Sequence, residues 1–318
     1  IRDDGESRGL GDVYKRQKLI DMLTDLNDYS IGIEDVLKEH FDEENIVYWM
    51  AFQILMGNVD TQNRNVYLYS PLNSDIWYFI AWDNDGCLMR PEYELRNFSD
   101  QNSWEKGISN YWGNILFQRC LKSRSFREKL NDAILDLREY LNKDMLTSKI
   151  ESYKNVLKPY LYLMPDAEYE PLTSEQYDQI AASLPDEIEK NYQLYLESLE
   201  TPMPFYIGVP TIDGDKLKFN WDVSYDLDAE DITYSVEVAG DYLFRDVIYQ
   251  NTTLTVPEAE MDLPKAGQYF VRVRATNTSG KTQDAFDYYV TDEGKYYGMR
   301  CFYITEDSTV EEDDYEEG

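Results

Sequence analysis

The chain has 318 residues, 42% of them hydrophobic and 14% aromatic, which suits about two folded domains. Its 62 acidic and 30 basic residues give a net charge of −32. This charge argues against nucleic acid and anionic membranes as partners, because both would be repelled. It favours basic proteins, metal ions or simply a well-solvated extracytoplasmic protein. No apolar run in the sequence is long enough to span a membrane.

The cysteines and the histidine exclude other classes of site. Cys87, Cys120 and Cys301 lie far apart without metal-type spacing, so they predict neither a disulfide framework nor a zinc site. The single histidine, His40, lies in a polar amphipathic stretch and is expected to be an ordinary surface or packing residue. No His-based triad can therefore be built.

Residues 1–17 are expected to be foreign to the native protein. They are polar, glycine-rich and basic in an acidic chain, and residues 12–17 (DVYKRQ) look like the translation of a transposon-type sequencing adapter. We therefore exclude them from fold reasoning and expect the native sequence to extend further upstream. A signal peptide would then not be visible.

Residues 18–57 predict helices. Residues 18–23 and 33–41 have helical spacing of apolar side chains, and a longer helix opens at residues 42–44. That helix is expected to end at Gly57, because glycine is favoured just after a helix C-terminus. No glycine-rich strand–turn–strand is present to cover a nucleotide.

Residues 66–82 predict a β-hairpin. The runs 66–69 and 76–82 are rich in aromatic and branched residues, and residues 70–75 between them are turn formers. Both strands are flanked on their outer side by oxygen-bearing side chains.

Asp60 and Asn65 precede the first predicted strand, and Asp83 and Asp85 follow the second. Antiparallel pairing would bring all four side chains to one end of the hairpin. Such a set could hold a hard divalent cation such as Mg²⁺, which takes oxygen ligands. Taken singly, each residue could equally serve as a turn former or cap.

The order Asp60-x-x-x-x-Asn65, hairpin, Asp83-x-x-Gly86 is that of the catalytic loop and metal-binding segment of protein kinases. There, one Asp accepts the proton of the attacking hydroxyl, while an Asn and a second Asp hold the metals. Here Asn-Val at 58–59 replaces His-Arg, and Asn-Asp-Gly rather than Phe-Gly follows Asp83. An ordinary protein kinase is therefore excluded as a close match.

The pattern GNxDxxxxNxYLY at residues 57–69, followed by WYFxxWDxD at 77–85, resembles the spore coat protein H (CotH) kinase-like family. The resemblance extends over roughly residues 18–200. It implies an atypical kinase fold that uses ATP and Mg²⁺ or Mn²⁺ to phosphorylate Ser or Thr of coat or surface proteins. It also implies an extracytoplasmic location: spore coat, cell surface or secreted.

Carried over by position, Asp60 matches the catalytic Asp and Asp83 the metal-binding Asp. Asn65 and Asp85 match supporting metal or phosphate positions, so that Asn65 and Asp83 would contact the cofactor. A nucleotide-covering lobe with its phosphate-binding Lys would lie upstream, and this fragment is expected to lack it.

An EF-hand calcium loop is a weaker alternative for the same carboxylates. Asp83, Asp85, Gly86 and Glu92 fall at loop positions three, five, six and twelve, but position one is Ala81, which offers no side-chain oxygen. The preceding segment is also strand-like rather than helical.

Residues 87–113 are expected to be irregular, with Trp104, Tyr111 and Trp112 packing over the core rather than covering the site as a substrate-binding loop. Further helices are predicted over residues 114–122, 125–141, 145–157, 173–184 and 185–199. Ser125 is expected to cap the second of these, and Pro159 to stop the third.

Beyond a linker at residues 201–204, alternating strands are predicted over residues 216–221, 233–238, 252–256, 267–277 and 285–290. They predict an antiparallel sandwich. Trp221 and the pattern YxVRVxAxNxxG at 269–280 resemble a fibronectin type III module, which usually acts as a spacer or binds proteins or glycans. The expected core residues are Trp221, Val236, Tyr269, Val271 and Val273.

The expected fold is an α+β multidomain chain. Residues 18–200 would form the mostly helical C-terminal half of an atypical kinase-like fold around the hairpin, and 203–292 an all-β, immunoglobulin-like sandwich. Residues 293–318 would give one strand at 296–304 and an acidic disordered tail from 306.

Two functions of another class stay open beside the kinase. The protein could be a catalytically inactive structural or interaction component of a spore coat or cell surface. Glycan recognition through the aromatic loop is a third possibility.

Overall fold

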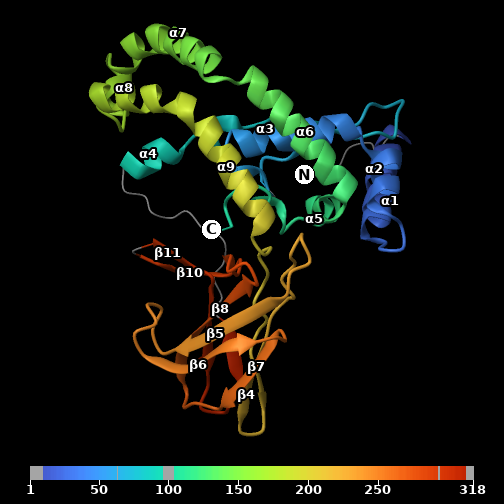
Figure 1. Ribbon diagram of the computed structural model, residues 1–318, viewed down its shortest axis with the longest axis vertical. Helices are drawn as coiled ribbons and strands as arrows, with labels where there is room; N and C mark the ends of the chain where they lie inside the picture. Colours follow the sequence, from blue (N-terminus) through green and yellow to red (C-terminus); the bar gives the residue numbers. More distant parts are fainter. Residues whose placement is uncertain (1–9, 63, 96–103, 293, 313–318) are drawn as a thin grey trace. The chain divides into compact units, whose positions relative to one another are not determined.

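The computed structural model describes residues 10–62, 64–95, 104–292 and 294–312 (Figure 1). The chain divides into two compact units, residues 1–96 with 111–193 and residues 97–110 with 194–318. Of the segment expected to be foreign, residues 1–9 lie outside the described part, and the first helix begins at Leu10. No helix in the described ranges is both long and apolar enough to cross a membrane.

The first unit is mostly helical around one hairpin. Its helices are α1 Leu10–Asn27, α2 Ile33–His40, α3 Glu43–Leu55, α4 Arg90–Leu95, α5 Ile115–Lys122, α6 Arg124–Tyr140, α7 Lys143–Leu161, α8 Ser174–Ser183 and α9 Glu187–Glu200, the last of which continues into the second unit. Short 3₁₀ turns are η1 Val59–Thr61, η2 Asn84–Gly86, η3 Ser109–Tyr111, η4 Asp166–Glu168 and η5 Leu184–Asp186. The hairpin strands are β1 Tyr67–Tyr69 and β2 Tyr78–Ile80.

Helix α3 is the centre of the first unit and lies beside α6 (Figure 1). Asp42 caps it by accepting a hydrogen bond from the Asn45 N–H at 2.9 Å, and the chain leaves it through Gly57 at φ +60°. Both ends were predicted. Most of its surface is buried and only the side with Glu44 and Tyr48 is exposed; the buried residues are Ile46, Val47, Trp49, Met50, Ala51, Gln53, Ile54 and Leu55.

The hairpin is seated on α3 by an amide side chain. The Asn45 side chain accepts from the Phe79 N–H (2.6 Å) and donates to the Phe79 carbonyl (3.2 Å), so it pairs with β2 as a neighbouring strand would. The Phe79 ring is 4% exposed and packs against Trp49 and Phe117, with centroids 4.8 and 5.8 Å away. The predicted hairpin is confirmed, with Leu68 paired to Phe79.

Side chains of α1 join this helix to the closed end of the hairpin and to α2. Lys18 is 6% exposed, and its Nζ donates to Ser70 Oγ (3.2 Å) and to the Pro71 carbonyl (2.6 Å) in the hairpin connection. His40 is buried as a packing residue, with its Nε2 2.7 Å from Asp25 Oδ2.

The boundaries of α6 and α7 and the structure of residues 87–113 differ from the prediction. The cap of α6 is Ser123, not Ser125, because Ser123 has extended backbone and its Oγ accepts from the Phe126 N–H at 3.2 Å. Helix α7 runs through Pro159 to Leu161, because the proline removes only one N–H in the last turn, on an exposed side of the helix. Residues 87–113, expected to be irregular, contain α4.

The aromatic residues of 104–112 pack as predicted. Trp104 is buried in the second unit against Phe286, with ring centroids 5.1 Å apart. Tyr111 and Trp112 are buried in the first unit, where Tyr111 contacts the Phe117 ring edge-on at 5.3 Å.

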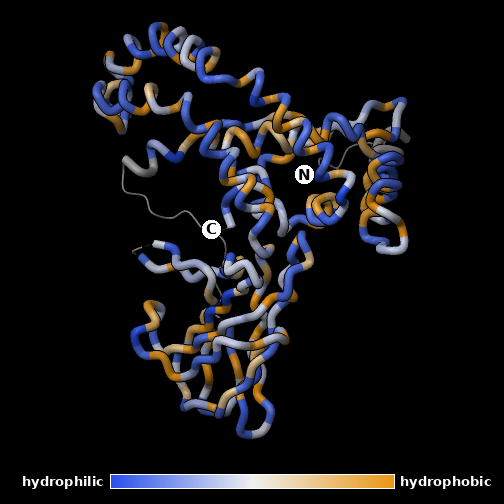
Figure 2. The backbone as a smooth tube through the Cα atoms, viewed as in Figure 1, coloured by the Kyte–Doolittle hydropathy of each residue, from blue (hydrophilic) through white to orange (hydrophobic). Residues whose placement is uncertain are grey.

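The second unit contains antiparallel sheets. Its strands are β3 Thr211–Asp213, β4 Lys216–Asn220, β5 Ile232–Ala239, β6 Val247–Leu254, β7 Glu258–Asp262, β8 Gly267–Asn277, β9 Thr282–Asp284, β10 Tyr288–Thr291, β11 Gly294–Tyr297, β12 Met299–Ile304 and β13 Val310–Glu312. One sheet has the order β13-β12-β8-β5-β6 with β9 beside β8, a second has the order β3-β4-β7, and β10 pairs with β11. Hydrophobic and hydrophilic residues are interspersed along the chain of this unit (Figure 2), and they alternate in β4 (KLKFN).

The core of the second unit joins side chains of the two larger sheets, including Leu217 and Phe219 of one and Val236 and Val271 of the other. Among the expected core residues, Trp221, Val236, Val271 and Val273 are buried. Tyr269 is only partly buried and packs against the core from outside. The fibronectin-like assignment stays a prediction.

The C-terminal segment differs from the expectation. The strand predicted over 296–304 is broken at Gly298, where φ is +75° and a Cβ would lie 2.9 Å from the Asp284 Cβ. The tail from 306, expected to be disordered, contains β13, which pairs with β12. Residues 313–318 lie outside the described part.

Asn45→Ala tests how the hairpin is attached to α3. The change removes both side-chain bonds to Phe79 and leaves a buried N–H and carbonyl unpaired, so we expect a loss of about 1–3 kcal/mol in the free energy of unfolding. Denaturant unfolding, followed by a probe in the first unit, measures it. Asn27→Ala, which removes an exposed amide bond to the Leu23 carbonyl, is the control. Equal losses in the two variants would contradict the role given to Asn45.

Candidate active site

Asp60 and Asn65 meet at the start of the hairpin, as predicted. Asp60 is exposed in the turn η1, and the Asn65 Nδ2 donates to Asp60 Oδ2 at 2.9 Å. Asn65 has φ +52°, a left-handed backbone that costs free energy in a residue other than glycine. The carboxylate of Asp60 is therefore oriented by an amide and open to solvent.

Asp83 and Asp85 lie on the turn that follows β2. Both are exposed; Asp83 has φ +50° and directly precedes η2, which contains Asp85. Leu88, just beyond, has φ +57°. Left-handed residues other than glycine thus occur in both turns, and such conformations are concentrated at functional sites.

The hairpin brings the two turns together through the residues beneath the carboxylates. Asn84 Oδ1 accepts from Gln53 Nε2 at 3.1 Å and from Asn58 Nδ2 at 3.4 Å. The Leu88 N–H donates to the Met56 carbonyl at 2.8 Å. No described hydrogen bond or ion pair joins Asp83 or Asp85 directly to Asp60.

Gly86 lets the turns approach this closely. A Cβ on residue 86 would lie 2.9 Å from Asn58 Oδ1 and 3.8 Å from the Asp60 Cβ, and real Cβ atoms are essentially never found at the first distance. Glycine is thus required here by close approach, because any side chain at residue 86 would overlap the Asn58 amide.

The donor set matches a hard cation that is only partly coordinated by protein. Among the described residues, no group of three or more His, Cys, Asp or Glu side chains is placed to hold a metal. Mg²⁺, however, is usually bound by one or two carboxylates together with waters and substrate phosphates. Asp83 and Asp85 offer two exposed carboxylates of the kind that such a partial site uses, whereas the described residues form no closed carboxylate cage.

Cys87 lies beside Asn58 but is no nucleophile. Burial raises the pKa of its thiol to about 12, a rise that outweighs the hydrogen bond with Asn58, which lowers it. The thiol is therefore protonated at neutral pH and chemically quiet.

A hydroxyl pair ties the Asp60 turn to the core. Thr61 is fully buried, its Oγ1 donates to the Asn58 carbonyl (3.2 Å), and it lies 3.0 Å from the Tyr111 hydroxyl. Tyr111 is in turn packed against Trp49. The turn that carries Asp60 is thus held on its buried side.

An ion pair anchors the segment after Gly86. Arg90 donates to Glu187 Oε2 (3.1 Å) and to Asn191 Oδ1 (2.6 Å), and Asn191 donates to the Leu55 carbonyl (2.8 Å). The Glu187 side chain is only 1% exposed. The start of α4 is therefore fixed to the end of α3 and the beginning of α9.

Sequence reasoning missed these supporting residues. Gln53, a fully buried amide in an apolar helix face, was a signal that could have been used. The contact between Arg90 and Glu187 spans 97 positions and leaves no local pattern.

An exposed aromatic surface adjoins the site on the outer face of the hairpin. The Tyr67 and Trp82 side chains are 51% and 52% exposed, with ring centroids 4.9 Å apart, and Tyr69 and Ile80 are exposed on the same hairpin. Trp82 directly precedes Asp83. Exposed aromatic patches usually mark a binding surface.

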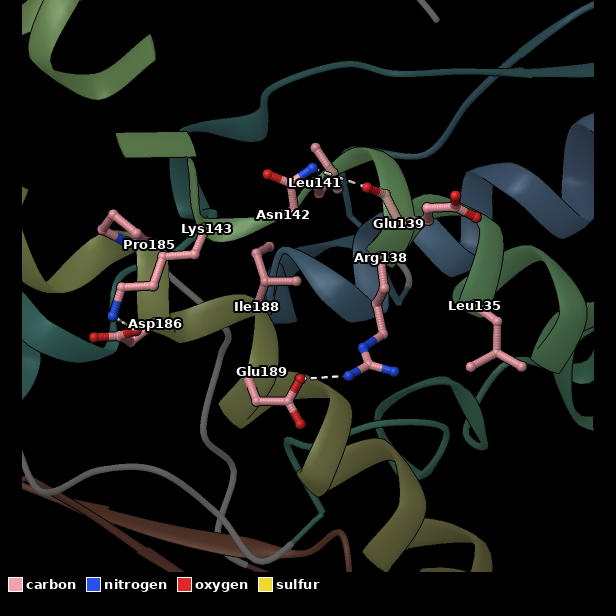
Figure 3. Close-up of a pocket in the computed structure, with 10 residues that line it drawn as sticks. All are labelled: Leu135, Arg138, Glu139, Leu141, Asn142, Lys143, Pro185, Asp186, Ile188 and Glu189. Carbon is pink, nitrogen blue, oxygen red and sulfur yellow. Dashed lines mark hydrogen bonds and ion pairs between the residues drawn. The ribbon is translucent and has the colours of Figure 1, made fainter. Parts of the chain in front are cut away.

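Hollows elsewhere in the first unit do not contain the predicted site residues. One, of about 570 Å³, is lined by Leu135, Arg138, Glu139, Leu141, Asn142, Lys143, Pro185, Asp186, Ile188 and Glu189 (Figure 3). Its two cations are paired, Arg138 with Glu189 and Lys143 with Asp186. A second, of about 470 Å³, lies between α3 and α6.

Comparison with known protein families gives an informative match. A family model described as CotH kinase protein matches residues 3–195, more than half of the chain. The match begins within the segment set aside as foreign and includes both turns and the hairpin. No curated protein matches the chain.

Among solved structures, surface layer protein SbsC, domains 1–6, is similar at 11% identity and a TM-score of 0.17. The aligned region covers 94% of this chain and 39% of that one. So low a score carries no argument about fold or function.

Gly86→Ala tests the contact between the turns. Because the added methyl group would overlap the Asn58 amide, we expect the free energy of unfolding to fall by about 1–3 kcal/mol. Gly32→Ala is the matched control, since its Cβ would meet nothing closer than 3.7 Å; we expect a change below about 1 kcal/mol there. Thermal and denaturant unfolding measure both, and a Gly86→Ala variant as stable as Gly32→Ala would contradict the geometry.

Proposed function

Because the chain belongs to the CotH kinase protein family, we propose that it is an atypical protein kinase that transfers the γ-phosphate of ATP to Ser or Thr of a protein. One observation carries the proposal: two turns, one with Asp60 and Asn65 and the other with Asp83 and Asp85, are held together at one end of the hairpin. That arrangement is what phosphoryl transfer needs, namely a proton acceptor beside a site for phosphate-bound metal.

Asp60 is proposed as the proton acceptor. It would orient the hydroxyl of the substrate Ser or Thr, whose oxygen bonds to the γ-phosphorus while the bond to the bridging oxygen of ADP breaks and the hydroxyl proton passes to the carboxylate. The hydrogen bond from Asn65 fixes the direction in which the carboxylate points. Most of the rate gain would come from positioning and charge neutralisation.

Asp83, with the Asn65 oxygen and Asp85, is proposed to hold Mg²⁺ or Mn²⁺. When bound, the metal would neutralise the ATP phosphates. The carboxylates of Asp83 and Asp85 are exposed and make no described ion pair with a Lys or Arg, so their charge is available to a cation. Hard oxygen donors on a turn that also receives phosphate suit either metal.

The aromatic outer face is proposed to receive the nucleotide base. The exposed Tyr67 and Trp82 rings, tilted by 38° to each other, offer aromatic faces beside the residues that would bind the phosphates. Stacking on aromatic rings is a sequence-tolerant way to hold a base. A base and its phosphates would then be held by neighbouring residues of one rigid hairpin.

The remaining parts of the proposal concern setting and partners. The substrate would be a coat or surface protein, and the protein would act outside the cytoplasm, on a spore coat or cell surface or as a secreted enzyme. The second unit is proposed to be a fibronectin type III-like module that contacts proteins or glycans. Its sheet order and its core of alternating strands support that assignment.

Asp60→Asn and Asp83→Asn test the chemistry. With labelled ATP, Mg²⁺ or Mn²⁺ and a Ser/Thr-rich acceptor, we expect the full-length protein to transfer phosphate and each variant to lose about 10²–10⁴-fold in kcat. Asp144→Asn, which removes an exposed carboxylate at the start of α7, is the control and should keep the parent rate. A full-length protein that neither transfers phosphate nor binds ATP with either metal would refute the kinase and leave the inactive structural role.

Trp82→Ala tests the base-binding surface. Loss of stacking should raise KM for ATP by about tenfold with little change in kcat, because the contact is the same before and during transfer. Tyr140→Ala removes another exposed ring, 68% exposed at the end of α6, and should leave KM for ATP unchanged. An unchanged KM for ATP in Trp82→Ala would contradict the proposal that the base binds to this surface.

A further inference from the structure

A continuous chain of three amide side chains lies beneath the carboxylates. Asn58 Nδ2 donates to Gln53 Oε1 (3.0 Å) and to Asn84 Oδ1 (3.4 Å), and Gln53 Nε2 donates to the same Asn84 oxygen (3.1 Å). Gln53 comes from α3, Asn58 precedes η1, and Asn84 begins η2. The chain therefore crosses from the central helix through the Asp60 turn to the Asp83 turn.

Asn58 is the residue on which this chain converges. It is 2% exposed, and its Oδ1 accepts from the Asp60 N–H at 3.3 Å. The same oxygen is the atom that a Cβ on residue 86 would approach to 2.9 Å. Asn58 thus contacts both turns and, through its Nδ2, both other amides.

The three amides have fixed hydrogen-bonding roles. In the described hydrogen bonds Asn58 donates through nitrogen and accepts through oxygen, Gln53 uses both ends of its amide, and the Asn84 side chain accepts. A buried polar network with every member satisfied is rigid, whereas a buried group deprived of its partner is costly. The amides are also neutral, so they fix the turns without neutralising the carboxylates above.

We propose that Asn58 is a positioning residue which, with Gln53 and Asn84, fixes the distance between the proton acceptor Asp60 and the metal-binding Asp83. The proposal rests on the kinase function proposed above. It adds to that function the residues that keep the Asp60 turn and the Asp83 turn at a fixed distance. A misplacement of about 1 Å between such groups can lower the rate by about 10²-fold.

Three substitutions separate this role from simple packing. Asn58→Asp keeps the shape but replaces the donating Nδ2 by a carboxylate oxygen, which would face the two acceptor oxygens of Gln53 and Asn84, so it should break the chain. Asn84→Leu removes the acceptor at the other end. Asn84→Asp keeps an acceptor oxygen at that end and should preserve both of its bonds.

Amide hydrogen exchange on the full chain is the first measurement. We expect exchange to become about tenfold faster in both turns, residues 58–61 and residues 84–88, in Asn58→Asp and also in Asn84→Leu. The reason is that each variant breaks hydrogen bonds that connect one turn to the other. Asn84→Asp should retain the parent protection. The inference is overturned if Asn58→Asp affects only 58–61, or if Asn84→Leu leaves 58–61 unchanged.

Kinetics with labelled ATP is the second measurement. Asn58→Asp should lower kcat by about 10²-fold and raise the Mn²⁺ concentration for half-maximal rate, since Asp60 and Asp83 lose their spacing. Asn155→Asp, an equal charge change on the exposed side of α7, should change neither quantity. A purely structural role would lower the amount of active enzyme and leave the half-maximal Mn²⁺ concentration unaltered, which would overturn the positioning role.

The two measurements also distinguish the inference from its premise. If the parent full-length protein transfers no phosphate, the proposed function fails, and hydrogen exchange alone then decides whether the amide chain couples the turns. If the parent transfers phosphate and the exchange of the two turns is uncoupled, the kinase stands and the inference fails.

Discussion

The candidate site depends on the two hydrogen bonds between the Asn45 side-chain amide and the backbone of Phe79 in β2. Two strands of three residues each are too short to be stable alone. Asn45 supplies the hydrogen bonds of a missing neighbouring strand to Phe79, and the Phe79 ring enters the aromatic cluster around Trp49. Lys18 holds the closed end of the hairpin. The open end, which carries the acidic residues, therefore extends from an anchored base.

That anchoring allows the turns to keep unfavourable backbone conformations. Asn65, Asp83 and Leu88 all have positive φ, which an unanchored loop would relax. The charges are separated from the supports: carboxylates face solvent, while neutral amides and a hydroxyl pair lie beneath them. Lysine or arginine in place of those amides would pair with the carboxylates and compete with a bound metal, so amides are the supports that leave the site its negative charge.

The sequence predicted what short-range patterns determine. The hairpin, the capped α3 ending at Gly57 and the buried valines of the second unit all follow from periodicity and turn residues within a few positions. Features that depend on distant partners were missed. The strand β7 is largely acidic, and only its pairing with β4 reveals that Ala259 and Met261 face the core. The candidate site shows the same difference. The charged residues were found from the sequence motif, whereas the amide side chains that support their turns were not.

The absence of three gathered carboxylates in the described part of the chain bears on how a metal would bind. A site that offers one or two carboxylates and an amide oxygen leaves several positions of an octahedral cation to water or phosphate. Such a site holds Mg²⁺ weakly by itself and more tightly when phosphates complete the coordination. By linkage, the nucleotide must then also bind more tightly when the metal is present. In the proposed kinase, metal and ATP would therefore occupy the end of the hairpin as a unit, with Asp60 positioned beside them before the protein substrate arrives.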